Sequence, residues 1–250
     1  QVLTSTGSGV AFEDASGGAE SINDLTDAKT FGTSSIMLGD ATTGTIDAAN
    51  YNTGLGVDVF EDLTSGDNNS AFGFFALGNN TSGGNNTVVG AYAGSLNVDD
   101  AENTIVGYAA NYPDGGSRVT AVGSQALNSN TASDNTAVGS LALNATVGGA
   151  ENTAVGSRAG IAVTSGDGND FSGFRAGQTT TTASANTVIG SYSLDNGAAN
   201  TGGLNTVIGH AAGRVITSGT RNTILGYDSG VAVTTGANNV LIGGNGTGNN

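Results

Sequence analysis

A five-residue motif with the consensus Asn-Thr-x-Φ-Gly, where Φ is apolar, recurs thirteen times with some variation along this 250-residue chain. Clear copies occupy residues 135–139, 152–156, 186–190 and 205–209. Of the twelve intervals between motif glycines, nine are 17 residues, two are 16 and one is 19. Repetition at such a short, regular period is typical of stacked repeat proteins. The motif glycines, which we expect to be structural, are Gly39, Gly56, Gly73, Gly90, Gly107, Gly123, Gly139, Gly156, Gly173, Gly190, Gly209, Gly226 and Gly243.

The two residues before each glycine are mostly apolar and β-branched, which favours a β-strand. Neighbouring strand residues point to opposite faces of a sheet, so both faces carry apolar side chains and both should be buried. A thin solenoid has one interior, and association of identical chains would cover the second face. The residue directly before the glycine is apolar in every copy except one, where it is Ser172. We predict that these residues form a buried apolar column: Leu38, Leu55, Phe72, Val89, Val106, Val122, Val138, Val155, Ile189, Ile208, Leu225 and Ile242.

The other repeat positions suggest further roles. The glycine is expected to adopt a φ that a Cβ disfavours or to allow close approach of a neighbouring backbone. Asn stands four residues before the glycine in 11 of 13 copies, and stacked Asn amides can bond to one another along a ladder. A small residue such as Ala126 or Ala159 follows three positions after the glycine. We predict a second, shorter strand there, then a polar return turn.

These patterns predict an all-β fold. Residues 34–250 would form a parallel β-roll or β-solenoid of about 13 rungs of about 17 residues. Residues 1–33 would form a lead-in, with a short strand near Val10. Because the chain starts at Gln1 and its last residues read like the approach to another motif copy, we expect it to be a piece of a longer protein.

Composition excludes several classes of function. The chain has no Cys, which removes disulfides, zinc-thiolate sites and thiol nucleophiles. Its net charge of −15 would repel a phosphate backbone, so nucleic acid is not expected as a partner. No apolar run is long enough for membrane insertion, and no signal-peptide pattern is present.

The Asn-Thr-(Ala/Val)-(Val/Ile)-Gly copies, with Ala followed by Leu or Gly three residues on, resemble the repeats of bacteriophage tail fibres. They are also similar to the head repeats of trimeric autotransporter adhesins, which build a parallel β-roll trimer. Residues 1–10 and the segment 22–27 look like the lead-in of phage fibre chains, which favours the phage alternative. The resemblance covers residues 34–250 and implies an intertwined or side-by-side homotrimeric fibre.

Candidate sites are few. Residues 166–171 resemble one calcium-binding nonapeptide, but neighbouring rungs lack the pattern, so an acidic turn is the simpler interpretation. The single histidine, His210, could bind a metal ion together with its copies on a threefold axis only if its side chain faced that axis. It lies just after a corner glycine, which is typical of an outer or corner position. Two groups of acidic residues could supply the paired carboxylates with which some enzymes cleave glycans, but acidic residues in solvated turns account for both groups. The groups are Asp99, Asp100 and Glu102, and Glu61 and Asp62.

Three aromatic residues form a further candidate. Phe74 and Phe75 suit either a glycan platform or an interface, whereas Phe72 falls in the apolar column and is expected in the core. No catalytic, cofactor-binding or metal-binding residue is predicted, and no cofactor.

The sequence therefore predicts a non-enzymatic segment of a phage tail fibre involved in host attachment and located in the virion. Its partners would be its own copies, other tail or surface-structure proteins, and a host receptor contacted outside this segment. One alternative is the passenger or head region of a trimeric bacterial surface adhesin, which would be extracellular. An ice-binding solenoid is a further alternative because Thr recurs in most rungs, but here Thr adjoins columns expected to be buried.

Overall fold

The computed structural model describes residues 2–5, 10–13, 28–31, 34–39, 48–112, 115–195 and 197–244. Strands β1 (Val2–Ser5) and β2 (Val10–Glu13) form an antiparallel pair, and β2 is the strand expected near Val10. Strand β3 (Ala28–Phe31) pairs antiparallel with β4 (Ser35–Leu38), so the main sheet reaches back into the predicted lead-in. Residues 14–27 of the expected lead-in lie outside the described residues. So do the C-terminal residues 245–250, which were expected to lead into another repeat.

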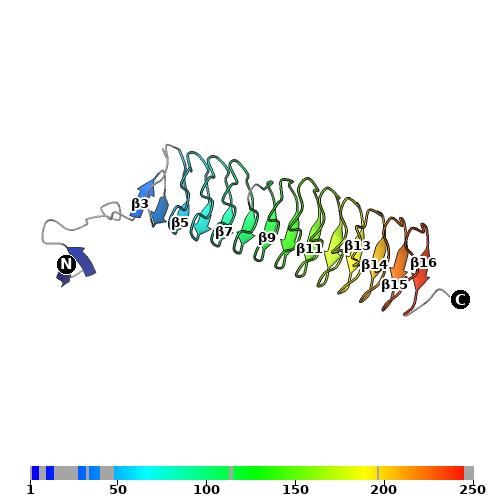
Figure 1. The fold of residues 1–250 in the computed structure, drawn as a ribbon. Coiled ribbons are helices and arrows are strands. Elements are labelled where there is room, and N and C mark those ends of the chain that lie inside the picture. The colour runs from blue at the N-terminus through cyan, green and yellow to red at the C-terminus, as the bar shows by residue number, and fades with distance from the viewer. Residues whose placement is uncertain are drawn as a thin grey trace.

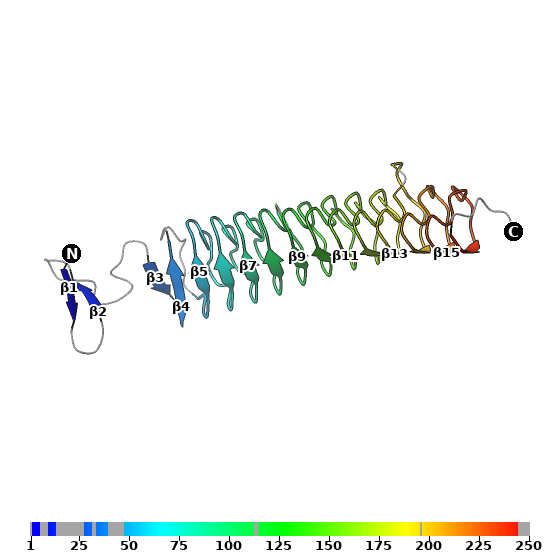
Figure 2. The ribbon, with the colours of Figure 1, turned by 90° about the horizontal axis from the view of Figure 1, so that it is seen from below.

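One strand from each motif copy joins a single parallel sheet, in which β4 to β16 follow one another in chain order. Figures 1 and 2 show these strands side by side along a rod, each followed by a loop that returns the chain to the next turn. The prediction of a parallel β-solenoid with about 17 residues per turn is confirmed. After β4 the strands are β5 (Thr53–Leu55), β6 (Ser70–Phe72), β7 (Thr87–Val89), β8 (Thr104–Val106), β9 (Thr120–Val122), β10 (Thr136–Val138), β11 (Thr153–Val155), β12 (Asp170–Ser172), β13 (Thr187–Ile189), β14 (Thr206–Ile208), β15 (Thr223–Leu225) and β16 (Val240–Ile242).

The strands keep one register although the turns differ in length. Thr104 pairs with Thr120 across a 16-residue interval, and Thr187 pairs with Thr206 across the 19-residue interval. Equivalent motif positions therefore stack on one another in successive turns, and the extra or missing residues are taken up by the return loops. Figure 2 shows the loop of the longest turn projecting between β13 and β14.

The predicted second strand is wrong. The residues after each corner glycine form tight turns in which alternate residues have a positive φ, such as Gln125 at 56° and Leu127 at 52°. These turns still bond to their neighbours along the rod: the Leu127 N–H donates to the carbonyl of Ala142 at 3.0 Å. A positive φ at every second residue cannot belong to a strand, so this wall of the solenoid is a stack of turns. The small residue in it is buried as expected, at Ala76, Ala93, Ala110, Ala126, Ala142, Ala159, Ala176, Ser193, Ala212 and Ser229.

The core is narrow and is filled by side chains of complementary size. Phe171, the middle residue of β12, is 1% exposed. Its ring lies where the turns before and after it carry Gly160 and Gly177, and a Cβ at Gly160 would be 2.8 Å from the Phe171 Cδ2. An aromatic ring in one turn is therefore accommodated by glycines in the turn wall, as close packing of a small core requires.

A ladder of buried Asn side chains holds the turns together. The Asn152 Oδ1 accepts hydrogen bonds from the backbone N–H and the side-chain amide of Asn169, both at 3.0 Å. The Asn152 Nδ2 donates to the Asn135 Oδ1 at 3.2 Å and to the Gly166 carbonyl at 2.9 Å. The ladder loses one side-chain bond where Val119 replaces Asn: the Asn103 Oδ1 accepts the backbone N–H of Val119 at 2.9 Å, but valine has no amide to donate a second bond. Within the described residues, the buried Nδ2 of Asn103 also has no hydrogen-bond partner. The expected bonding between stacked Asn side chains is thus present.

Replacing Asn152 with Ala should lower the unfolding free energy by at least about 3 kcal/mol, because it strands several buried polar groups of neighbouring turns. Urea unfolding followed by circular dichroism measures the loss. Asn79→Ala is the control, since this partly exposed side chain makes no hydrogen bond within the described residues. Equal losses in the two variants would contradict the role of the ladder.

Candidate functional site

The most extended candidate surface is the outward side of the parallel sheet, which we call the outer sheet face. It is formed by the first and third residues of each strand from β5 to β16 and by Leu38, the last residue of β4. The middle residue of each strand points into the core, as in β7, where Val88 is buried between exposed Thr87 and Val89. The third positions carry the apolar column described above. The first positions carry a threonine column: Thr53, Thr87, Thr104, Thr120, Thr136, Thr153, Thr187, Thr206 and Thr223.

Within a single chain, the apolar column predicted to be buried is not in the core. Leu55 is 50% exposed and Ile189 is 42% exposed. The other members are also exposed or only partly buried: Leu38, Phe72, Val89, Val106, Val122, Val138, Val155, Ile208, Leu225 and Ile242. The interior position is the residue before, such as Val188, which is 0% exposed. The physical reason is strand alternation: if one of two adjacent residues faces the narrow interior, the other must face outward.

A second candidate surface lies just beyond the corner glycines, where exposed and partly exposed rings contact one another along the rod. One group contains Phe74, Phe75, Tyr92, Tyr108 and Tyr112, with ring centroids 5.1 to 6.4 Å apart. Phe74 and Phe75 are thus part of an aromatic cluster, whereas Phe72, expected in the core, is 38% exposed on the outer sheet face.

The other aromatic group contains Phe174, Tyr192, His210 and Tyr227. His210 lies edge-on to Tyr192, with centroids 5.8 Å apart, and stacks on Tyr227 at 5.5 Å with the planes 12° apart. His210 is therefore an exposed member of a ring stack.

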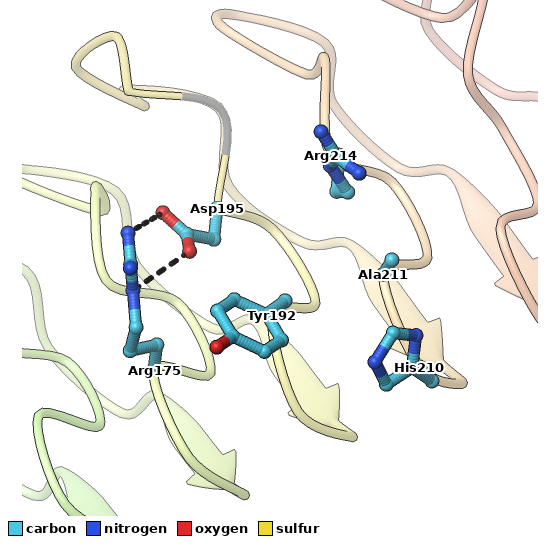
Figure 3. A pocket seen from close by; sticks show the side chains of 6 residues that line it. All are labelled: Arg175, Tyr192, Asp195, His210, Ala211 and Arg214. Atoms are coloured by element: carbon cyan, nitrogen blue, oxygen red, sulfur yellow. Dashed lines mark hydrogen bonds and ion pairs between the residues drawn. The ribbon is translucent and has the colours of Figure 1, made fainter.

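Beside this second group the surface is hollowed, with a volume of about 400 Å³. Figure 3 shows Arg175, Asp195 and Tyr192 on one side of the hollow and Arg214, Ala211 and His210 on the other. The Asp195 carboxylate, 4% exposed, pairs with the Arg175 guanidinium, whose Nε lies 3.1 Å from Oδ2. The Arg175 guanidinium also lies 5.2 Å from the centre of the Tyr192 ring. We call this site the corner hollow.

Sequence reasoning singled out His210 but missed the rest of the corner hollow. The signal is the column two residues after each corner glycine, which carries Arg158, Arg175 and Tyr192 in succession and then the small Ala211. The side chain five residues after a glycine lies over this column in the preceding turn, as the Asp195–Arg175 pair demonstrates. That spatial relation follows from the path of the turn wall, which the sequence alone did not predict.

Two of the acidic candidates accept hydrogen bonds from a neighbouring turn. In the calcium-like segment 166–171, the Asp167 Oδ1 accepts a hydrogen bond from the Ala150 N–H at 2.8 Å in the preceding turn. The Asp100 Oδ1 accepts one from the Ser117 hydroxyl at 3.4 Å. Among the described residues, no three His, Cys, Asp or Glu side chains are grouped to share a metal ion.

An exposed ion pair links two of the shortest turns. The Arg118 guanidinium donates to the Asp134 carboxylate at 2.7 Å and 2.9 Å. This hydrogen bonding lowers the pKa of Asp134 and raises the pKa of Arg118. Because the carboxyl pKa is lowered on folding, the pair stabilises the fold above the ordinary carboxyl pKa and ceases to do so on acidification. Both groups are exposed to solvent, so salt screens the interaction.

Comparison of the chain with protein-family models, curated proteins and solved structures finds no match to any of them. In the part of the chain that the structure describes, no helix is long and apolar enough to cross a membrane.

Proposed function

We propose that the chain is a segment of a non-enzymatic fibre shaft, assembled as a homotrimer through its outer sheet faces. The observation that supports this proposal is the apolar column, which runs along the rod with exposed fractions such as 41% at Val89, 44% at Val155 and 43% at Leu225. Soluble monomers seldom expose a continuous apolar strip of this kind. Identical chains that pack around a common axis cover the strip on every copy at once.

Charge supports the same arrangement. The chain carries a net charge of −15, and identical chains repel one another wherever acidic surfaces meet. The strands of the outer sheet face contain few charged residues: Asp170 is the only one among β5 to β16. Copies can therefore meet on this face at little electrostatic cost.

Native mass spectrometry of the purified chain is the direct test, and we expect three chains per particle. A folded monomer at micromolar concentration would contradict the proposal, because the apolar strip would then be stably exposed to water.

The assignment to a phage tail fibre rests on the resemblance of the repeats and of the lead-in segments. On this proposal the chain is part of a virion, its neighbours are other tail proteins, and host attachment involves a receptor bound mainly outside this segment. The alternative is a trimeric bacterial adhesin with the same shaft. Flanking genes separate the two: tail genes and a virion-attachment domain support the fibre, and a C-terminal membrane anchor supports the adhesin.

A second candidate function is ice binding, favoured by one specific observation. The threonine column and the apolar column lie on the same outward sheet face, and both are at least partly exposed in a single chain. The threonines therefore do not adjoin a column buried in the core. Trimer formation would hide this face, so the two functions require different assemblies. Thermal hysteresis from a monomeric sample supports ice binding, and its absence from a trimeric sample supports the fibre.

A further inference from the structure

The corner hollow has an internal counterpart in which the corresponding space is occupied. In the turn that follows Gly107, the corner positions are Tyr108 and Ala109, and the ring of Tyr92 lies one turn before them. In the turn that follows Gly209, the same positions are His210 and Ala211, and the preceding ring is Tyr192. Both copies pair the rings edge-on, at 6.3 Å for Tyr92–Tyr108 and 5.8 Å for Tyr192–His210.

The two copies differ at the fifth residue after the glycine. In the first copy this residue is Tyr112, whose ring lies 6.4 Å from that of Tyr92 at an angle of 71°. In the second copy it is Arg214, and a hollow of about 400 Å³ remains beside Tyr192 and above the small Ala211. The chain itself thus shows that a six-membered ring fits beside a tyrosine at this kind of corner.

The charges around the hollow are unusual for this chain. It has six Lys and Arg residues against 21 acids, yet two arginines line this one site. Asp195 neutralises Arg175 through their ion pair. Within the described residues, the Arg214 guanidinium has no ion-pair or hydrogen-bond partner. Asp228, which continues the column in the next turn, does not line the hollow. The site therefore combines an aromatic wall with one uncompensated positive charge.

We propose that the corner hollow binds a sugar ring that carries a carboxylate, a hexuronic acid residue of a surface glycan. The ring would lie against Tyr192 and His210 over Ala211, where Tyr112 lies in the filled copy. The Arg214 guanidinium would donate paired hydrogen bonds to the carboxylate, the geometry that arginine matches best. A hollow of about 400 Å³ lies within the usual range for small-ligand sites.

The probe is methyl glucuronide, with methyl glucoside as the neutral analogue, and the measurement is saturation-transfer NMR with the full chain. We expect transfer to the ring protons of the glucuronide. Ala211→Tyr should abolish it by filling the hollow, since tyrosine is already accepted at this column position in Tyr92 and Tyr192, both with a φ of 58°. Arg214→Gln should weaken glucuronide binding roughly tenfold, the factor that a charge-assisted hydrogen bond contributes.

Arg221→Gln is the matched control, because it removes the same charge from an exposed arginine outside the hollow. It should leave binding unchanged. Transfer that persists in Ala211→Tyr, or no transfer with the native chain, would overturn the site. Equal binding of glucuronide and glucoside would overturn the role of Arg214, and displacement by acetate at the same concentration would overturn the role of the ring. Native mass measured on the same samples keeps this outcome separate from that of the trimer proposal, because the variants lie outside the outer sheet face.

Discussion

Replacing Gly156 with alanine should unfold the middle of the solenoid. Gly156 has a φ of 136°, which side-chain-bearing residues rarely adopt. An added Cβ would also lie 2.6 Å from the carbonyl carbon of Gly173 in the next turn, so backbone would meet backbone. Relief requires the two turns to separate, which breaks the sheet hydrogen bonds between β11 and β12. We expect a loss of more than about 4 kcal/mol, at the extreme of single substitutions.

Gly148→Ala is the matched control for this experiment. An added Cβ at Gly148 would have no atom within 4 Å. The unfolding free energy should then change by no more than about 0.5 kcal/mol. Thermal unfolding monitored by far-UV circular dichroism compares the two variants. If Gly156→Ala melted at the temperature of Gly148→Ala, close stacking of the corner glycines would not be what positions the turns.

Aspartate at neighbouring positions of β13 should give two different failures. Val188 is 0% exposed in the single chain, so Val188→Asp places an unpaired charge in the core and should prevent folding. Ile189 is 42% exposed, so Ile189→Asp should leave each chain folded and prevent trimer formation. Native mass spectrometry should then report folded monomers for Ile189→Asp and little soluble protein for Val188→Asp.

Ser140→Asp serves as the control, because this exposed residue lies just past a corner glycine and outside the strands. It should remain trimeric and folded. A trimer that survives Ile189→Asp would show that the outer sheet face is not the contact surface. The face would then be accessible, as ice binding requires. The contrast between positions 188 and 189 therefore tests the assembly and the inward–outward assignment together.

Much of the fold follows from the repeat alone. The 17-residue period, the β-branched pair before each glycine and the recurring Asn predicted a parallel β-solenoid, and the structure has it. The Asn ladder was also predictable, because a polar residue at the same position in almost every turn must stack on its own copies. These features depend on what each residue does locally and on the identity of successive turns.

Three features depended on tertiary structure. Whether Val188 or Ile189 faces the core is decided by the direction in which the turn closes, since alternation alone makes the two equivalent. The recurring small residue three positions after each glycine predicted a second, shorter strand packed closely on the first. The backbone instead takes positive φ values, such as 52° at Leu127, to close a narrow turn.

The corner hollow arises only when three successive turns are stacked. Arg175, Tyr192 and Arg214 are far apart in sequence, and none has a distinctive motif around it. Their proximity comes from the side chain five residues after one glycine lying over the column of the preceding turn. The sequence by itself determined the repeating unit and its stacking, because both are local and periodic. The inward side of each strand and the shape of the corner were decided by how the turn closes in three dimensions.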